Sequence, residues 1–343
     1  MNKKQNYFLR NALLSISICA GLAQFNGTEA VEGGSGVYAL GYISPQAGLM
    51  PESGTYLSYN YFGYQGKSTS AVSADRQVAL PGTHLKLPVQ LNGSMKTEVN
   101  SYSSLFSLTH VFAEKLLGGQ AGFAVLLPYA KADLDLSGSG VLSLTSPFGH
   151  VHRLNLSGND SQSSSGVGDT TLSGLLGWHD GRWHSMAMLN LYVPTGAYDR
   201  QRPVNIGRNH WAVEPMVALT YLNEASGLEV SGATGVTFNQ KNPATEYKSG
   251  TELHLDLSVI QHFSEMFYIG VSGYAYQQLT GDSGSGASDA NKGQVYGLGP
   301  IVGGAIPVGQ KQKLFFNGRY YKESGVENRL KGDTVFLTAT VRF

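Results

Sequence analysis

The sequence has few charged residues, one cysteine and, after its first thirty residues, no long apolar run. Cys19 lies within those first residues, so the rest of the chain contains neither a disulfide nor a thiolate metal site. Charged residues make up 14% of the chain, against roughly 25% in soluble domains. Lys+Arg and Asp+Glu are both 24, so no basic field is available to hold nucleic acid. No later apolar run reaches the ~20 residues of a membrane-spanning helix.

The N-terminus has the pattern of a secretory signal peptide. Lys3, Lys4 and Arg10 precede an apolar, uncharged run from Ala12 to Ala23, which is the order of regions in such signals. Cleavage after Ala23 and cleavage after Ala30 both remain open, and the second suits the glycine-rich start that follows. We therefore expect residues 1–30 to be a cleaved signal peptide that exports the chain through the inner membrane.

Segments of alternating apolar and polar residues indicate strands of membrane-spanning length. Only helices and closed barrels can cross hydrocarbon, because unpaired backbone groups are too costly there. A barrel strand needs about 9–11 residues that alternate between a lipid face and a lumen face. In 251–260, Leu255 and Leu257 alternate with Asp256 and Ser258. The predicted strands are 55–65, 100–112, 119–132, 169–180, 183–194, 210–222, 227–239, 251–260, 266–279, 294–306, 312–323 and 335–343.

The connections between these segments alternate in length. The long ones are 66–99, 133–168, 195–209, 240–250, 280–293 and 324–334, and the short ones are 113–118, 181–182, 223–226, 264–265 and 307–311. Outer-membrane barrels have short turns on the periplasmic side and longer loops outside. The long connections are rich in serine and glycine, which favour loops. The sequence therefore predicts an all-β fold: a transmembrane, antiparallel, up-and-down barrel of about twelve strands over residues 54–343, in the outer membrane of a Gram-negative cell.

One strand carries the residue types of a hydrolase. His254, Asp256 and Ser258 share a face of segment 251–260. A catalytic triad needs its histidine between the other two groups, and side chains two apart on a strand are separated by ~6.8 Å. We therefore interpret these residues as polar lining of the lumen. The nine histidines include no H-E-x-x-H spacing, so neither a metal nor a cofactor is expected.

Charges within predicted strands should face the lumen. A lipid-facing arginine near the membrane midplane costs ~2–4 kcal/mol, which argues for inward positions for the charges in 210–222, 251–260 and 335–343. The alternation around Arg319 leaves its facing open. The candidates for lining the solute path are Met188, Tyr192, Glu214, His254, Asp256, Tyr274, Tyr276 and Arg342.

Aromatic residues are placed near the ends of several predicted strands, where amphipathic rings favour the membrane interface. They are Tyr56, Trp178, Trp183, Trp211, Tyr268 and Tyr321. The chain ends on Phe343, after an alternating strand. A terminal aromatic residue of this kind is the signal that the barrel-assembly machinery recognises, so we expect Phe343 to direct assembly.

Several short motifs occur in a fixed order along the chain. Their members are Gly168, Asp169, Pro194, Thr195, Gly196, Gly207, Trp211, Gln278 and Asp282. Together they resemble the outer-membrane transporters grouped under the meta-pathway of phenol degradation, and the resemblance covers roughly residues 36–343. It implies passive uptake of small hydrophobic or aromatic compounds. By analogy with fatty-acid and aromatic-hydrocarbon channels, it also implies that residues 31–53 form a periplasmic or plug segment.

The function expected from the sequence is therefore a narrow outer-membrane channel without catalytic residues. Its expected partners are a small hydrophobic solute, outer-membrane lipid and the barrel-assembly machinery. Two other readings stay open: a structural or adhesive barrel without transport, and an outer-membrane lipid hydrolase.

Overall fold

The computed structural model describes residues 34–43, 45–79, 85–285, 287, 292–309 and 312–343. The predicted signal peptide, 1–30, lies outside the described residues. Within them, no helix is long and apolar enough to cross a membrane.

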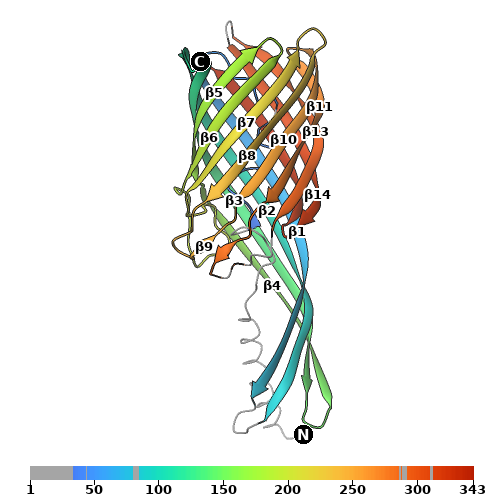
Figure 1. Cartoon of the computed structure of the whole chain (residues 1–343). Coiled ribbons are helices and arrows are strands. Elements are labelled where there is room, and N and C mark those ends of the chain that lie inside the picture. Colours follow the sequence, from blue (N-terminus) through green and yellow to red (C-terminus); the bar gives the residue numbers. More distant parts are fainter. Residues whose placement is uncertain (1–33, 44, 80–84, 286, 288–291, 310–311) are drawn as a thin grey trace.

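Twelve strands close into a barrel, as predicted (Figure 1). Each pairs antiparallel with the next, and β15 pairs with β1 to complete the ring. The strands are β1 (Gly54–Ala79), β2 (Lys86–Leu116), β3 (Gly119–Thr145), β5 (Thr170–Asp180), β6 (Trp183–Val193), β7 (Ala212–Asn223), β8 (Leu228–Asn239), β10 (Glu252–Ser264), β11 (Phe267–Gln278), β13 (Gln294–Val308), β14 (Gln312–Glu327) and β15 (Lys331–Arg342). Closure satisfies the backbone of every barrel strand on both sides.

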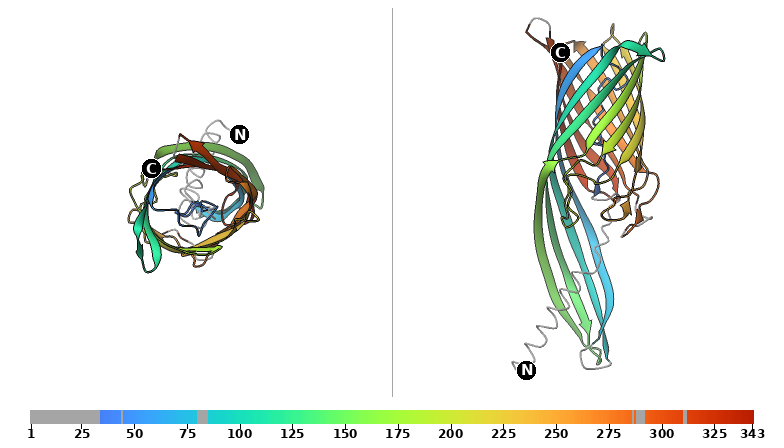
Figure 2. Two further views of the ribbon diagram at one scale, coloured as in Figure 1. Left: turned by 90° about the horizontal axis from the view of Figure 1, so that it is seen from above. Right: turned by 90° about the vertical axis from the view of Figure 1, so that its left-hand side faces the viewer.

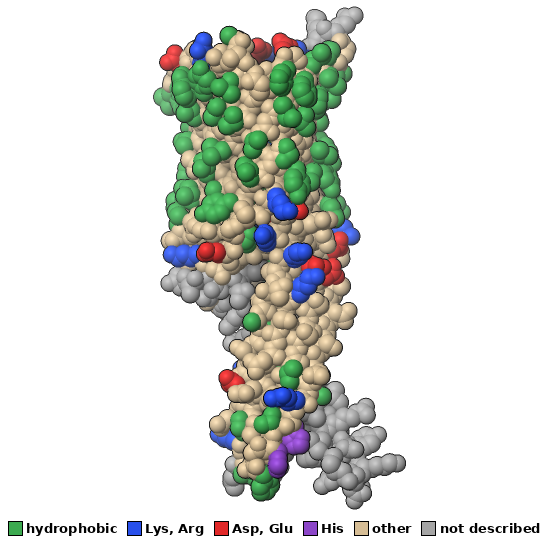
Figure 3. Space-filling model, turned by 90° about the vertical axis from the view of Figure 1, so that its right-hand side faces the viewer, with side chains coloured by type: hydrophobic (Ala, Val, Ile, Leu, Met, Phe, Trp, Pro, Cys, Tyr) green, Lys and Arg blue, Asp and Glu red, His purple; other side chains and the backbone are tan. Residues whose placement is uncertain are grey.

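The two faces of the wall differ in polarity, which follows from the alternation in sequence. On β10, Leu257 is 50% exposed on the outside, whereas the neighbouring Asp256 is 1% exposed on the inside. On β15, Leu337 points outward and Phe336 is fully buried. The space-filling view shows apolar side chains distributed over the outside of the barrel (Figure 3). An apolar exterior around a polar interior is the arrangement that suits a barrel in lipid.

The two ends of the barrel have connections of different length. At one end, here called the turn end, strands are joined by the short links 117–118, 181–182, 224–227, 265–266 and 309–311. These agree with the short turns predicted from sequence, and β1 begins and β15 ends at this same end (Figure 1). The opposite end, here called the loop end, carries the longer links and a two-stranded sheet of β9 (Tyr247–Lys248) and β12 (Ser283–Gly284).

The prediction of long loops at 66–99 and 133–168 is wrong. These residues continue β1, β2 and β3 beyond the barrel and form β4 (Val151–Val167). We call this part the extension; it consists of residues 68–79, 86–99, 129–145 and 151–167, in the strand order β1-β2-β3-β4. Figures 1 and 2 show it projecting from the loop end. Twelve residues of β1 beyond the barrel correspond to about 40 Å at the rise of a strand.

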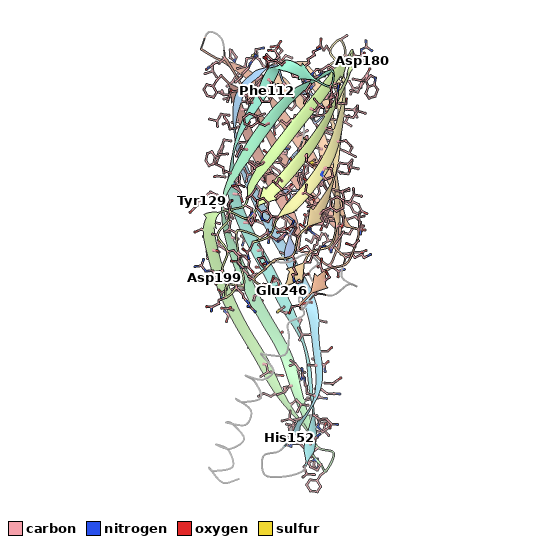
Figure 4. The ribbon with its side chains drawn as sticks, turned by 60° about the vertical axis from the view of Figure 1, so that its left-hand side comes forward. Phe112, Tyr129, His152, Asp180, Asp199 and Glu246 are labelled. Atoms are coloured by element: carbon pink, nitrogen blue, oxygen red, sulfur yellow. The ribbon has the colours of Figure 1, made fainter. Side chains whose placement is uncertain are left out.

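The extension forms strands because its sequence also alternates, although its polar residues are mainly Ser, Thr and Asn. Leu87, Val89 and Leu142 are 7%, 5% and 3% exposed, whereas Pro88, between the first two, is exposed. β3 pairs with β5 up to Leu126 and with β4 from Tyr129 onward. Figure 4 places Tyr129 at this junction and His152 at the far part of the extension.

Three of the aromatic residues expected at the membrane interface face the interior instead. Tyr56, Tyr268 and Tyr321 are 7%, 8% and 0% exposed, so for them the prediction is wrong. Each side chain lies on the inward face of its strand. Nearness to a strand end does not tell which face a residue is on; the alternation along the strand does. Trp183 and Trp211 are 52% and 42% exposed on the outside, as an interfacial position requires.

Candidate functional site

Residues 34–43 and 45–53, here called the N-terminal segment, contact the inner wall of the barrel. Viewed from above, this blue part of the chain lies within the ring of strands (Figure 2). Ala47 and Met50 belong to a buried cluster with Tyr56 and Met216. Leu40 and Tyr42 pack against a second cluster, which contains Tyr274, Tyr276, Val295, Tyr321 and Phe336. The segment therefore rests on apolar surface contributed by strands on different sides of the barrel.

Two buried charges hold the middle of this segment. Asp256 of β10 accepts hydrogen bonds from the Tyr38 hydroxyl and, at 3.1 Å, from the backbone N–H of Gly41. Arg319 of β14 donates from Nη1 to the carbonyl oxygens of Gly41 and Tyr42 at 2.8 and 2.9 Å. Arg319, whose facing the sequence left open, thus points inward and is 3% exposed. We call Asp256 and Arg319 the clamp.

The clamp requires glycine at position 41. Gly41 has a φ of +80°, which side chains other than glycine rarely adopt. A Cβ atom there would lie 2.7 Å from the ring of Tyr321. The close approach of this peptide to the wall therefore depends on the missing side chain, and it brings the Gly41 carbonyl within reach of Arg319.

A second set of contacts holds the segment nearer the turn end. Glu229 accepts a hydrogen bond from the backbone N–H of Gln46 at 2.8 Å, and the Thr220 hydroxyl accepts one from Gly48 at 2.9 Å. His262 Nε2 lies 2.7 Å from the other oxygen of Glu229. Sequence reasoning missed these residues, although Glu229 is a charge inside a predicted strand and the rule applied to Glu214 would have found it.

Glu214 is the centre of a buried polar network. Its carboxylate is fully buried and accepts hydrogen bonds from Tyr192 at 2.7 Å, Asn190 at 3.0 Å and Thr237 at 2.6 Å. His254 Nε2 lies 3.0 Å from the same carboxylate. The structure thus joins three residues that the sequence analysis selected separately: Tyr192, Glu214 and His254.

The network leaves no room for a triad on β10. The Nε2 atom of His254 is engaged by Glu214, and its ring stacks on Tyr38 with the centroids 3.7 Å apart. Asp256 is engaged by the N-terminal segment. A proton relay from Ser258 would need both of these groups. The contacts of His254 and Asp256 instead hold the N-terminal segment against the barrel wall.

Replacing Glu214 tests how much the network stabilises the barrel. The Glu214→Ala variant leaves buried donors on Asn190, Tyr192 and Thr237 without their acceptor. Each buried donor left without an acceptor typically costs about 1–3 kcal/mol, so we expect a fall of at least that size in the free energy of unfolding. Urea titration of barrels refolded in lipid vesicles measures it. Glu214→Gln, which keeps one carbonyl acceptor, should lose less; equal losses for both variants would contradict this account.

The remaining lumen candidates are held by wall carboxylates or lie at the turn end. Tyr274 donates to Glu323 at 2.9 Å and Tyr276 to Glu252 at 3.0 Å. Met188 is half-buried against the cluster that contains Met50. Arg342 pairs with Glu52 and donates to the Ser53 carbonyl at 2.7 Å, so it fastens the end of the N-terminal segment to β15.

The motif residues mostly organise the loop end. Asp169 accepts hydrogen bonds from the backbone N–H of Gly196 at 2.8 Å and of Arg208 at 2.6 Å. A Cβ atom on Gly196 would lie 2.6 Å from the Cα of Gly207, so two backbones cross at this point. Thr195 accepts from Thr170 N–H at 2.9 Å. These contacts fix the link from β6 to β7 against the start of β5.

The other motif residues have related roles. Asp282 accepts hydrogen bonds from Gly250 N–H at 2.8 Å, from the Tyr247 hydroxyl and from Gln278. Gly168 donates its N–H to the Pro128 carbonyl at 2.8 Å, where β3 changes partners. Pro194 directly follows the end of β6, where its missing N–H donor does no harm. Trp211 faces outward.

A cavity of about 2430 Å³ runs beside the N-terminal segment. Its lining includes Lys313 and Phe343 from the turn end, and Tyr198, Arg202 and Arg329 from the loop end. In between it is lined by wall residues such as Met188, Tyr192, Tyr274 and Arg319. The N-terminal segment thus fills part of the barrel interior, and the cavity occupies space beside it. In the part of the chain that the structure describes, no three His, Cys, Asp or Glu residues are grouped so as to hold a metal ion.

Comparisons with known proteins agree with this arrangement. The sequence model of a family described as "Putative MetA-pathway of phenol degradation" matches residues 66–339. No curated protein matches the chain significantly. The solved COG4313 outer membrane channel from Pseudomonas putida has a TM-score of 0.57 and 17% identity, over 88% of this chain and 100% of its own.

Two further solved structures are more distant. A Pseudomonas aeruginosa FadL homologue has a TM-score of 0.41 and 8% identity, and it covers 84% of this chain and 90% of its own. The CymD monoaromatic hydrocarbon channel also has a TM-score of 0.41, with 10% identity over 92% of this chain and 98% of its own.

Proposed function

Because the chain belongs to the MetA-pathway family of phenol degradation, as its motifs predict, we propose that it is an outer-membrane channel for passive uptake of small hydrophobic or aromatic compounds. The turn end faces the periplasm in this proposal and the loop end faces outward, since short turns are periplasmic in outer-membrane barrels. The solute enters at the loop end and leaves at the turn end. No residue acts as a catalyst.

The observation that carries the proposal is the cavity lined from both ends of the barrel. A twelve-stranded barrel lies between the filled eight-stranded barrels and the wide porins of sixteen to eighteen strands. Its lining combines apolar side chains, including Met188 and Leu175, with hydroxyls such as Tyr192. Ligand sites for small organic molecules have this mixture of apolar surface and a few fixed polar groups.

The N-terminal segment is, in this proposal, a plug that narrows the channel. Its backbone is held by the clamp and by Glu229 and Thr220. Such contacts keep water and large solutes from a direct path while leaving space beside the segment. Small flat molecules pass through that space, either past the resting segment or after it shifts.

Liposome swelling with a panel of solutes tests transport. Vesicles that contain the protein should swell faster than empty vesicles in phenol, toluene derivatives and small aromatic alcohols, and no faster in a disaccharide. Rates equal to those of empty vesicles for every solute would defeat the proposal. Equal acceleration for all solutes, disaccharide included, would point to an unselective pore instead.

Two other functions give different outcomes in related assays. A structural or adhesive barrel should give no swelling above that of empty vesicles. An outer-membrane lipid hydrolase should release fatty acid from the same vesicles. The exterior argues against the hydrolase, because the lipid-facing residues of β10, Leu257 and Val259 among them, are apolar.

Phe343 serves, in this proposal, as the assembly signal read by the barrel-assembly machinery. Its ring is 67% exposed at the turn end, and its backbone N–H donates to the Thr55 carbonyl at 2.8 Å. The Phe343→Ala variant keeps the backbone bond and loses only the ring. We expect a lower yield of heat-modifiable barrel in outer membranes but normal refolding in vesicles without the machinery. Equal defects in both settings would contradict a signalling role.

A further inference from the structure

The extension has two edges that no strand covers. β1 loses its partner β15 after the pair Lys67 and Lys331, so residues 68–79 pair only with β2. On the other side, β4 pairs only with β3. Among the described residues, no other strand pairs with either edge. Seen along the barrel, β4 curves outside the ring of strands, where a neighbouring molecule can reach it (Figure 2).

These edges lack most of the features that usually prevent strands from pairing with other chains. Exposed edges are normally guarded by charged side chains, above all lysine, by proline, by bulges or by shortness. The charged side chains of the two stretches are Asp75 and Arg76 on β1 and Arg153 and Asp160 on β4. Residues 68–76 and 152–160 contain neither lysine nor proline. The pairing of β1 with β2 and of β3 with β4 continues without a register shift along both stretches. Both edges are therefore regular and long enough to add a strand.

The two edges carry opposite charges at the same height. Asp75 is opposite Gln90, Gln90 is opposite Ser143, and Ser143 is opposite Arg153. Residues opposite one another in a ladder share a face of the sheet. Asp75 and Arg153 are both exposed, and within the described residues neither belongs to an ion pair. On this face of the sheet, Asp75 of one edge and Arg153 of the other are thus complementary, while Arg76 and His152 lie on the opposite face.

The backbone groups at that height match as well. In an antiparallel ladder a residue that exchanges hydrogen bonds with one neighbour points away from the other. We followed this rule across the three ladders from Asp75 to Arg153. The backbone N–H and C=O groups of both residues then point the same way: both toward their free edges, or both away from them. When the free edge of β1 in one copy lies against the free edge of β4 in another, with Asp75 opposite Arg153, the hydrogen-bond ladder therefore continues without a change of register.

Like edges cannot pair in this way. All copies inserted in one membrane point in the same direction, so β4 of one copy runs parallel to β4 of another. A two-fold axis along the membrane normal would then place N–H against N–H and C=O against C=O. β1 and β4 run in opposite directions in the extension, so only the pairing of unlike edges is antiparallel and complementary.

From these observations we infer that neighbouring copies of this chain join through their extensions, with β1 of one copy pairing antiparallel to β4 of the next and Asp75 opposite Arg153 of the neighbouring copy. Such a contact is heterologous, so repetition produces rings or rows. The inference uses the proposed placement in the outer membrane for the direction of the strands. It does not depend on transport.

Cysteine cross-linking in outer membranes tests the inference. Cys19 is the one cysteine of the chain, so in a Cys19→Ser background each single substitution introduces a unique thiol. Two tagged versions, Asp75→Cys and Arg153→Cys, are expressed together and oxidised. Residues opposite one another across a strand pair bring Cβ atoms to about 4.5–5.5 Å, close to disulfide range. We expect a mixed disulfide-linked dimer severalfold more abundant than either same-site dimer.

A central-strand position on the same face is the matched control. Ser139 of β3 is exposed and four residues from Ser143, on the same face of the strand, but β2 and β4 flank it. Mixed dimers of Ser139→Cys with Arg153→Cys should stay at background. Equal yields for the Asp75 and Ser139 mixtures, or equal yields for like and unlike edges, would overturn the inference. Swelling assays on the same cysteine variants report separately on the channel, so loss of cross-links with normal swelling rejects only this inference.

Discussion

Replacing Leu257 with arginine is expected to prevent most of the protein from assembling in lipid. Leu257 lies in the middle of β10, is 50% exposed and faces outward between Asp256 and Ser258. An arginine near the membrane midplane costs ~2–4 kcal/mol in a barrel. A loss of that size removes a large share of the 5–15 kcal/mol by which proteins are usually stable.

Refolding into lipid vesicles, followed by the heat-dependent shift in gel mobility, measures the folded fraction of Leu257→Arg. Met266→Arg is the matched control, because Met266 is 59% exposed in the short link between β10 and β11. There the cost should fall to about 0–1 kcal/mol. Similar folded fractions for the two variants would mean that the outer face of β10 does not contact hydrocarbon.

Removing the clamp is expected to open the channel. In a variant with Arg319→Met and Asp256→Asn, the Tyr42 carbonyl loses its donor and the Tyr38 hydroxyl loses a charged acceptor. The Gly41 carbonyl keeps only the Tyr321 hydroxyl, at 3.2 Å. Each buried polar group left without a partner costs about 1–3 kcal/mol. Every 1.4 kcal/mol changes a population about tenfold, so the displaced state of the N-terminal segment should become at least about tenfold more populated.

Single-channel recording in planar bilayers measures this change as more frequent and longer openings. Arg182→Met is the control, because Arg182 is an exposed arginine in the turn between β5 and β6. Deletion of residues 34–50 should give a steadily open channel. If the deletion opens the channel but the double variant does not, the clamp is not what holds the segment. If neither changes the current, the segment is not a plug.

The barrel could be predicted from sequence because its signals are local. A strand in lipid must alternate every second residue, and Leu257 with Ser258 shows this directly. The connections gave a second local signal, since the turn-end links span only a few residues. The twelve strands follow from these two patterns without any knowledge of which strands meet.

The extension could not be predicted from composition, because its composition is typical of loops although its residues alternate as in a strand. Segment 133–168 is rich in serine and glycine, which favour loops when nothing orders them. In the structure 133–145 and 151–167 are paired strands joined by a short turn, and the alternating Leu142 is buried. Polar side chains form a strand when a neighbouring strand supplies hydrogen bonds, and whether such a neighbour is present depends on the rest of the fold.

The contacts of the lumen could be predicted only in part. Alternation places Glu214, His254 and Asp256 inside the barrel, and all three are there. It says nothing of their partners, because Gly41 and Asp256 are 215 residues apart and Tyr42 and Arg319 are 277 apart. Arg319 itself was ambiguous, yet Glu323 has the same parity and is also buried. A second charge on the same face of β14, at Glu323, is therefore the sequence signal that Arg319 faces the lumen.

The height of the extension has a consequence for the cell surface. With the loop end outward, as proposed, about 40 Å of strand β1 lies beyond the barrel, and Phe148 in the turn between β3 and β4 is 87% exposed. In that proposed orientation, a large particle that approaches the bacterium meets the tip of the extension before it meets the rim of the barrel. The extension consists only of β1 to β4 and stands on one side of the rim, so it leaves the way open for small solutes.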